Sequence, residues 1–287
     1  MAGGGGLTRT RFAPSPTGPL HLGHALAALT AAELADPGEF LLRIEDIDQS
    51  RARPEYESAI FDDLRWLGLR WQEPVMRQSE RLSAYQEALE RLAQKELIYP
   101  CACGRADIMA ALSAPQEGQA PTFGPDGPVY PGTCRHRKMA EAGPNDAIRL
   151  HAARAFDLLG ANGVEFFDEN IAPGLPHRLS TEDFLSGIGD VVLARRGIGT
   201  SYHLSVVVDD TAQGITLVTR GKDLLDSTWI HVLLQRLLDL PVPRYHHHRL
   251  IRDENGKRLA KRDNARAIRL FRDEGASPDD LRRMIAV

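Results

Sequence analysis

The spacing of apolar residues predicts alternating strands and helices over the first hundred positions. Arg9–Ala13 is expected to form a strand, and the short apolar run Phe40–Ile44 is typical of a second one. Between them, Leu22–Leu34 is rich in Ala and Leu and predicts a helix that stops at Asp36-Pro37-Gly38. This order of elements indicates a parallel sheet whose strands are connected by crossover helices.

Two further segments of this region have helical periodicity. The first begins near Pro54, a residue that suits the first turn of a helix. The apolar residues on one face are Tyr56, Ile60, Leu64 and Leu67 in the first segment, and Leu82, Tyr85, Leu89 and Leu92 in the second. Both segments continue the alternation of strands and helices.

The pattern changes near Pro100. Residues 113–133 carry several Pro and Gly residues and no periodicity, which predicts an irregular insertion, and a weaker strand-rich stretch continues to about residue 180. We therefore predict an α/β nucleotide-binding fold that is interrupted once. Its parts are a Gly-rich tail at 1–8, a first half at 9–99, the insertion at 100–180 and a second half at 181–287.

The second half is expected to return to strands and helices. Leu204–Val208 predicts a buried strand, Gly214–Thr219 its neighbour, and Thr228–Leu238 a helix. The run His246-His247-His248 is expected at a strand end or in a loop. Ser277 is a good N-cap for a closing helix that ends at Ile285.

Composition narrows the class of protein. The chain has 287 residues, 43% of them hydrophobic, and a net charge of -4, which is typical of a globular protein with a large core. Because no apolar run approaches the roughly 18 residues of a membrane span and the N-terminus lacks a signal pattern, we expect a cytoplasmic protein. The net charge also argues against indiscriminate nucleic-acid binding, although basic residues gather at 244–272.

Two strings more than 200 residues apart indicate ATP chemistry. His21-Leu22-Gly23-His24 opens the predicted helix, whose N-terminus offers N–H groups and a positive dipole end to a phosphate. The two histidines can add donors where charge develops on a reacting phosphorus. Lys257–Arg262 supplies cations that can clamp a polyphosphate. We interpret the two strings as the sides of a split ATP site.

Further blocks of sequence resemble the glutamyl-tRNA synthetases, class I enzymes with a Rossmann-type catalytic domain. The blocks that carry the resemblance are Arg11–Gly18, His21–His24, Arg43–Asp48, Tyr202–Leu204, Val207–Asp210, Gly214–Thr216 and Arg220-Gly221. Lys257–Arg262 stands at the position of the family's KMSKS loop. There, Arg258 replaces the first lysine and Ala260 replaces the serine, so one hydroxyl contact with a phosphate is missing.

The resemblance implies roles for single residues. ATP would be bound by His21, Gly23, His24, Arg258, Leu259 and Lys261, and His21, His24 and Lys261, together with Mg²⁺, would stabilise the charge that develops during catalysis. Glutamate would be bound by Arg11, Phe12, Ala13, Pro14, Ser15, Glu45, Tyr202 and Arg220. By similarity, Arg11 and Tyr202 would hold the side-chain carboxylate, Arg220 the α-carboxylate and Glu45 the ammonium group.

The three cysteines form a second candidate site. Cys101, Cys103 and Cys134 are too few, and odd in number, for a disulfide scaffold, whereas zinc takes four sulfur or nitrogen ligands in a tetrahedron. On chemistry alone, His136 is the natural fourth ligand. The resemblance instead implies Tyr130, from the pattern Cys-x-Cys…Tyr-x-x-x-Cys. Such a zinc ion would be structural and would pin the irregular insertion.

The acceptor of the glutamate is also implied by resemblance. Only about 25 residues follow Arg262, so we expect no anticodon-binding domain. That shortening, with the zinc-type insertion, resembles a branch of the family that activates glutamate without tRNA and attaches it to queuosine in the anticodon loop of tRNA(Asp). We expect a monomer. Its partners would be L-glutamate, ATP and queuosine-modified tRNA(Asp). The alternatives are a short enzyme that charges the 3′ end of tRNA(Glu), a small-molecule adenylyltransferase and an inactive tRNA-binding paralogue.

Overall fold

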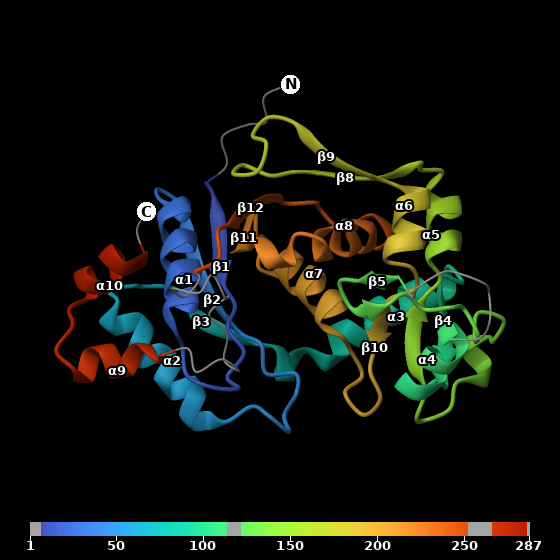
Figure 1. The fold of residues 1–287 in the computed structure, drawn as a ribbon, viewed down its shortest axis with the longest axis horizontal. Helices are drawn as coiled ribbons and strands as arrows, with labels where there is room; N and C mark the ends of the chain where they lie inside the picture. Colours follow the sequence, from blue (N-terminus) through green and yellow to red (C-terminus); the bar gives the residue numbers. More distant parts are fainter. Residues whose placement is uncertain (1–6, 114–121, 252–265, 286–287) are drawn as a thin grey trace.

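The computed structural model describes residues 7–113, 122–251 and 266–285 (Figure 1). A parallel sheet of strands β1 (Arg9–Phe12), β2 (Glu39–Ile44) and β3 (Gln72–Arg77) forms the first half. Strands β11 (Leu217–Gly221) and β12 (Arg244–His248) form a second parallel pair. The two groups meet where Thr216 N donates to the Arg9 carbonyl, so β11 lies beside β1. The predicted α/β fold with a parallel sheet is therefore confirmed.

Helices connect these strands. In the first half they are α1 (Leu22–Ala35), α2 (Pro54–Trp66) and α3 (Leu82–Gln94), the last preceded by a 3₁₀ turn, η1 (Gln78–Arg81). In the second half they are α7 (Tyr202–Ala212), the 3₁₀ turn η3 (Lys222–Leu224) and α8 (Ser227–Leu237). The final helices α9 (Ile268–Asp273) and α10 (Pro278–Ile285) pack into the core that α1, α2 and the first sheet share. None of the helices in the described ranges is long and apolar enough to cross a membrane.

The insertion is built around an antiparallel sheet in the order β10-β7-β4. Its strands are β4 (Ile98–Cys101), β7 (Ala147–Leu150) and β10 (Val192–Ala194). The other elements of this part are α4 (Arg105–Ser113), the short β5 (Phe123–Gly124) and β6 (Gly127–Pro128), the 3₁₀ turn η2 (Met139–Glu141), α5 (Ala152–Leu159), the hairpin β8 (Gly163–Phe167) and β9 (Pro176–Ser180), and α6 (Thr181–Gly187). Strand β10 carries the chain from the insertion back towards α7.

One predicted strand is wrong: Leu204–Val208 lies inside helix α7. Because α7 packs against α3 and α8, seven of its eleven residues are buried, and the apolar run of such a buried helix resembles that of a buried strand. The local signal for a helix was Ser201, whose side chain accepts a hydrogen bond from Leu204 N as an N-cap. The next strand begins at Leu217 and not at Gly214, because Gly214 has a φ of +62° in the turn that follows α7.

Candidate functional site

The two histidines of the His-x-Gly-His string cap the N-terminus of α1 by pointing back at each other. His21 Nδ1 accepts from Gly23 N at 3.1 Å, and His24 Nδ1 accepts from His21 N at 3.1 Å. The two rings lie 3.8 Å apart between centroids. A neutral imidazole that accepts at Nδ1 carries its proton on Nε2, so the cap sets both rings as Nε2–H donors.

Gly23 supports this arrangement by its lack of a side chain. A Cβ at this position would lie 2.9 Å from His21 Cε1, which is closer than real carbon contacts allow. The glycine therefore makes room for the His21 ring itself.

A pocket of about 170 Å³ opens beside this cap. Its wall includes His21, Gly23 and His24 from the start of α1, and residues of the second half such as Gly221 and His248. The pocket thus joins the ends of β11 and β12 to the N-terminus of α1, which suits a nucleotide phosphate. The string Lys257–Arg262, with Arg258, Leu259, Ala260 and Lys261, lies outside the described residues.

A second pocket, of about 330 Å³, lies at the ends of β1 and β2. Three of the residues implied for glutamate binding line it: Ser15, Glu45 and Tyr202. The backbone joins two sides of this pocket, because Glu45 N donates to the Pro14 carbonyl at 3.0 Å. Phe12 is packed in the core beneath, where it supports the segment that contains Ala13 and Pro14.

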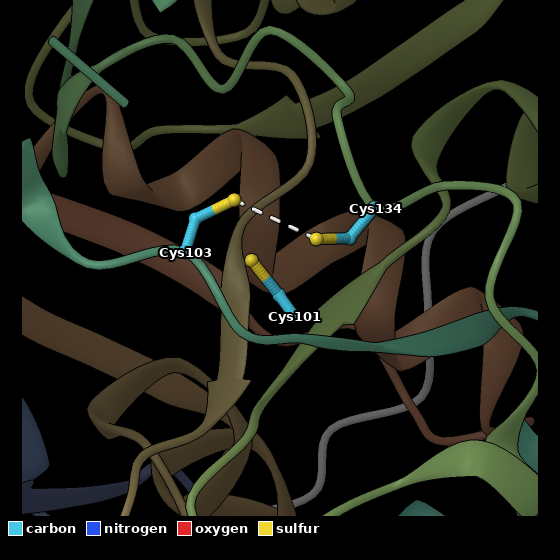
Figure 2. A group of neighbouring side chains, drawn as sticks. All are labelled: Cys101, Cys103 and Cys134. Carbon is cyan, nitrogen blue, oxygen red and sulfur yellow. Dashed lines mark hydrogen bonds between the residues drawn. The ribbon is translucent and has the colours of Figure 1, made fainter. Parts of the chain in front are cut away.

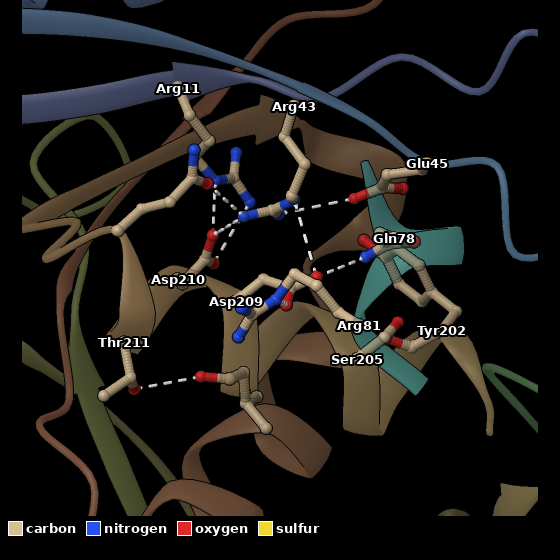
Figure 3. A network of polar contacts seen from close by, with 12 residues as sticks. Arg11, Arg43, Glu45, Gln78, Arg81, Tyr202, Ser205, Asp209, Asp210 and Thr211 are labelled. Atoms are coloured by element: carbon tan, nitrogen blue, oxygen red, sulfur yellow. Dashed lines mark hydrogen bonds and ion pairs between the residues drawn. The ribbon is translucent and has the colours of Figure 1, made fainter. Parts of the chain in front are cut away.

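Arg11 and Arg220 are buried below this pocket, each only 6% exposed. Arg11 forms a two-pronged ion pair with Asp210 of α7, from Nε at 2.9 Å and from Nη2 at 3.3 Å, and donates to the Thr219 carbonyl (Figure 3). Arg11 is thus oriented by the second half of the fold, although it lies on β1 of the first. Its charge is shared with Asp210.

Arg43 completes this buried group of charges. Its guanidinium, which is inaccessible to solvent, donates to Asp210 at 2.7 Å and to Glu45 at 3.3 Å (Figure 3). Burial lowers the pKa of Arg43, but the carboxylates of Asp210 and Glu45 outweigh burial and raise it, so Arg43 stays charged. Burial raises the pKa of Asp210, but Arg11 and Arg43 outweigh it, and the net pKa of Asp210 is lowered.

At Glu45, burial has a larger effect on the pKa than the neighbouring cations have. Its side chain is 11% exposed, and burial raises its pKa although the Arg43 and Arg11 cations lower it. A substrate ammonium group at this carboxylate would supply the further positive charge that its ionised form needs. The geometry therefore suits an amino acid whose ammonium group binds at Glu45.

Arg220 has a different environment. Its Nε donates to His247 Nε2 at 3.1 Å, its Nη1 lies 2.9 Å from His231 Nδ1, and its Nη2 donates to Thr228 Oγ1 at 2.5 Å. Tyr202 lies near enough for Arg220 to stabilise its phenolate, but burial dominates and raises the pKa of Tyr202. Arg220 is thus held in place by neutral groups.

Several of these polar partners were missed by sequence reasoning. Asp210 and Arg43 lie within the blocks that carry the family resemblance, and a charged residue within an apolar run was an available signal of a buried ion pair. His247 belongs to the histidine run, which was expected to be a strand end or loop, and it is 1% exposed within β12. Asp168 carried no signal, because its partner His247 lies 79 residues away in the sequence. His231 contacts Arg220, 11 residues away, but no local pattern indicates this contact.

The cysteine cluster lies in the insertion (Figure 2), and none of its three residues lines either of these pockets. The sulfur atoms of Cys101, Cys103 and Cys134 are within 4.8 Å of one another, and Cys103 Sγ lies 3.5 Å from Cys134 Sγ. Tyr130 Oη lies 3.3 Å from Cys101 Sγ and 3.4 Å from Cys103 Sγ. His136 is exposed. A tetrahedral zinc ion with bonds of about 2.3 Å to sulfur requires such a spacing of thiolates, and the hydroxyl of Tyr130 stands where a fourth ligand would be.

The electrostatics of Cys134 suit a metal ligand. Burial raises the pKa of this thiol, but hydrogen bonds from Tyr130, the Ala102 backbone and the other thiols outweigh burial and lower it to about 7. A thiol that ionises near neutral pH binds a metal ion at a smaller cost.

Comparisons with known proteins agree with this geometry. The sequence profile of the family described as tRNA synthetases class I (E and Q), catalytic domain, matches residues 8–287. The chain is 58% identical to the glutamyl-Q tRNA(Asp) synthetase of Rhodobacter capsulatus, over 97% of this chain and 99% of that protein. It is 39% identical to the glutamate–tRNA ligase 2 of Nitrosococcus oceani, over 97% of this chain and 58% of the length of that protein.

A solved structure agrees as well. A glutamate tRNA ligase from Elizabethkingia meningosepticum, crystallised in complex with its amino acid, matches with a TM-score of 0.77 and 26% identity, and covers 98% of this chain. This chain spans 61% of the length of that protein. The chain therefore belongs to the class I tRNA synthetase family for glutamate and glutamine, among the glutamyl-Q tRNA(Asp) synthetases.

Proposed function

We propose that this chain activates L-glutamate with ATP, without the help of tRNA, and transfers the glutamyl group to the queuosine base in the anticodon loop of tRNA(Asp). The single observation that carries the proposal is the 58% identity over 99% of the length of a glutamyl-Q tRNA(Asp) synthetase. The buried charges of the second pocket support the choice of amino acid. We further propose that the chain acts as a monomer in the cytoplasm, where ATP and tRNA are available.

The amino-acid pocket offers complementary charges to glutamate. Arg11 and Arg220 are two buried guanidinium groups whose charges both act on Tyr202, a residue of the pocket wall, and we assign one to each substrate carboxylate. Glu45 also lines the pocket and is the partner for the ammonium group. A neutral side chain, such as that of glutamine, could not form the charge-assisted hydrogen bonds that a carboxylate forms with a guanidinium group, which favours glutamate.

The first step would be an in-line displacement at the α-phosphorus of ATP. An oxygen of the glutamate α-carboxylate forms the new bond to phosphorus, the bond to the bridging oxygen breaks, and pyrophosphate leaves with its electron pair. The carboxylate is already ionised, so no general base is needed. The Nε2–H groups that the α1 cap sets on His21 and His24 would donate to the phosphate oxygens, together with Lys261 and the Mg²⁺ that accompanies ATP.

The second step would be acyl transfer. A hydroxyl of the queuosine ring attacks the carbonyl carbon of the glutamyl-adenylate and loses its proton, and AMP leaves with the electrons of the broken C–O bond. The products are AMP and a glutamyl ester on the modified base.

We also propose one structural zinc ion, held by Cys101, Cys103, Cys134 and Tyr130. The spacing of the three sulfur atoms and the position of Tyr130 Oη support this ligand set over one that uses the exposed His136. When bound, zinc would link β4 to the loop that precedes β7. The small apolar cluster of Tyr99, Cys101, Tyr130 and Cys134 would gain stability from the bound metal ion.

The proposal is tested in two stages. In the first, the purified chain is incubated with ATP, glutamate and labelled pyrophosphate in the absence of tRNA, and exchange of label into ATP is expected with glutamate but not with glutamine or aspartate. The variant Tyr202→Phe should have a higher KM for glutamate, and its unchanged KM for ATP serves as the internal control. Absence of exchange by the wild-type chain would refute tRNA-independent activation.

In the second stage, labelled glutamate and ATP are supplied with four RNAs. These are tRNA(Asp) with queuosine, the same tRNA without it, an isolated queuosine-bearing anticodon stem-loop, and tRNA(Glu). We expect label on the two queuosine-bearing RNAs only. Label on tRNA(Glu) would favour the second candidate, charging of a tRNA 3′ end, for which the 39% identity to a glutamate–tRNA ligase is the supporting observation.

A further inference from the structure

A line of buried hydrogen bonds passes through Arg220 and joins two carboxylates that lie far apart in the sequence. On one side, His231 Nδ1 lies 2.9 Å from Arg220 Nη1, and His231 Nε2 lies 3.0 Å from His203 Nδ1. His203 Nε2 then lies 2.8 Å from Asp126, in the turn between β5 and β6. On the other side, Arg220 Nε donates to His247 Nε2 at 3.1 Å, and His247 Nδ1 lies 2.5 Å from Asp168.

The donor and acceptor of every hydrogen bond in this line follow from the chemistry of Arg220, the residue at its centre. A guanidinium group only donates, so His231 must accept at Nδ1 and His247 must accept at Nε2. The proton of His231 is therefore on Nε2 and is donated to His203, whose own Nε2 proton is donated to Asp126. The proton of His247 is on Nδ1 and is donated to Asp168. The three histidines are neutral, and each has one defined tautomer.

The burial of these groups agrees with neutral rings. His203, His231 and His247 are each less than 5% exposed. Burial, reinforced by the Arg220 charge, holds the pKa of His231 well below its usual range, and burial also lowers that of His247. Burial raises the pKa of Asp168, but the hydrogen bonds from His247 and the backbone outweigh burial and lower it to about 2.

The consequence for Arg220 is that its guanidinium is oriented without being neutralised. In the described part of the chain, no carboxylate forms an ion pair with Arg220. Its hydrogen-bond partners are neutral groups, among them His231, His247 and the hydroxyls of Thr228 and Tyr202. Arg11, in contrast, shares its charge directly with Asp210. One imidazole ring separates Arg220 from Asp168, and two separate it from Asp126.

We propose that His231 and His247 are positioning residues for Arg220, acting as neutral spacers that fix the guanidinium and keep its full positive charge for a carboxylate of the substrate. The inference rests on the proposed function, because it takes Arg220 to bind glutamate. It adds two residues to the glutamate site, and it connects Asp126 of the insertion to that site through His203.

A matched pair of substitutions tests the spacer directly. In His231→Asn, the amide oxygen can accept from Arg220 as a neutral group, whereas in His231→Asp a carboxylate of the same shape pairs with Arg220 and neutralises it. We expect KM for glutamate in ATP–pyrophosphate exchange to rise less than about threefold in the first variant and at least about tenfold in the second, the scale of one lost charge-assisted hydrogen bond. KM for ATP should stay unchanged in both.

A purely structural role of His231 predicts a different ranking of the two variants. Because a carboxylate binds a guanidinium more strongly than an amide does, His231→Asp would then be at least as active and as stable as His231→Asn. Equal values of KM for glutamate in the two variants would overturn the proposal. Glu165→Ala is the control for a change of charge in the insertion, since Glu165 pairs only with the exposed Arg178, and KM for glutamate should not change.

A second measurement does not depend on activity. Two-bond ¹H–¹⁵N spectra of the imidazole rings distinguish the tautomers, and we expect Nε2–H for His203 and His231 and Nδ1–H for His247. A protonated ring, or the opposite tautomer at His231, would overturn the inference even in a chain that activates glutamate. Absence of exchange by the wild-type chain, with the expected tautomers present, would instead refute the proposed function and leave the hydrogen-bond line standing.

Discussion

Substituting Asp63 by asparagine should stabilise the protein at neutral pH. Asp63 lies in α2 with only 3% of its surface exposed, and the nearest cation is Arg272 of α9, 4.0 Å away. Burial raises the pKa of Asp63 from 3.8 to about 6, although Arg272 lowers it. The unfolded chain thus ionises this carboxyl more readily than the folded chain does, and ionisation opposes folding.

The magnitude follows from the difference between the two pKa values. Raising the pKa from 3.8 to about 6 corresponds to about 3 kcal/mol of stability lost at neutral pH. The stability is fully present below about pH 4, where both states are protonated, and it is lost as the pH rises through about 6. Asn cannot ionise, and the pKa of about 6 already includes the attraction of the partly exposed Arg272. The net gain expected for Asp63→Asn is therefore about 3 kcal/mol at pH 7.5.

Urea denaturation of both chains at several pH values between 4 and 7.5 measures this gain. The difference in the free energy of unfolding should grow from near zero at the lowest pH to its full value above pH 7. The matched control is Asp62→Asn on the same helix, where the carboxylate is 60% exposed and should contribute less than about 1 kcal/mol at any pH. A gain for Asp63→Asn that is equally large at pH 4, or no gain at pH 7.5, would refute the reasoning.

Three further outcomes are expected. KM for glutamate should rise as the pH is lowered, because burial raises the pKa of Glu45 and only the ionised carboxylate binds an ammonium group. Glu45→Gln should have a high KM for glutamate that no longer depends on pH. A KM for ATP that follows the same trend would contradict this explanation. Gly23→Ala should lower kcat of the exchange reaction several-fold without lowering Tm, because its methyl group displaces the His21 ring, and an unchanged kcat would show that the ring is not needed. A chelator should release one zinc ion per chain and lower Tm, and Cys134→Ser should likewise lose zinc and have a lower Tm. His136→Ala should retain the zinc ion. Loss of zinc from His136→Ala would show that His136, and not Tyr130, is the fourth ligand.

Some of the predicted site residues lie in one region of the fold because they are on strands or directly follow them. Arg11 lies on β1 and Glu45 follows β2, and neighbouring parallel strands bring such positions to one edge of a sheet. The helix cap at His21 was also encoded locally, within four residues. These parts of the site depend on contacts that are close in sequence or are fixed by strand order.

The remainder of the site depends on contacts that no local pattern specifies. Asp168 meets His247 across 79 residues, and Asp126 meets His203 across 77. The error at α7 has a related origin, since hydrophobic periodicity disappears when both sides of a helix are buried. Partner choice and burial on two sides are properties of the assembled fold, so a single sequence does not reveal them.

The ion pairs of Asp210 have a consequence for how the protein unfolds. This one carboxylate, on a helix of the second half, is the shared counter-ion of Arg11 and Arg43 on two strands of the first half. Local opening that separated the halves would leave two guanidinium groups in an apolar interior without that partner, at a cost of several kcal/mol. The halves should therefore open together, as one cooperative unit in hydrogen exchange, even though the whole insertion separates them along the chain.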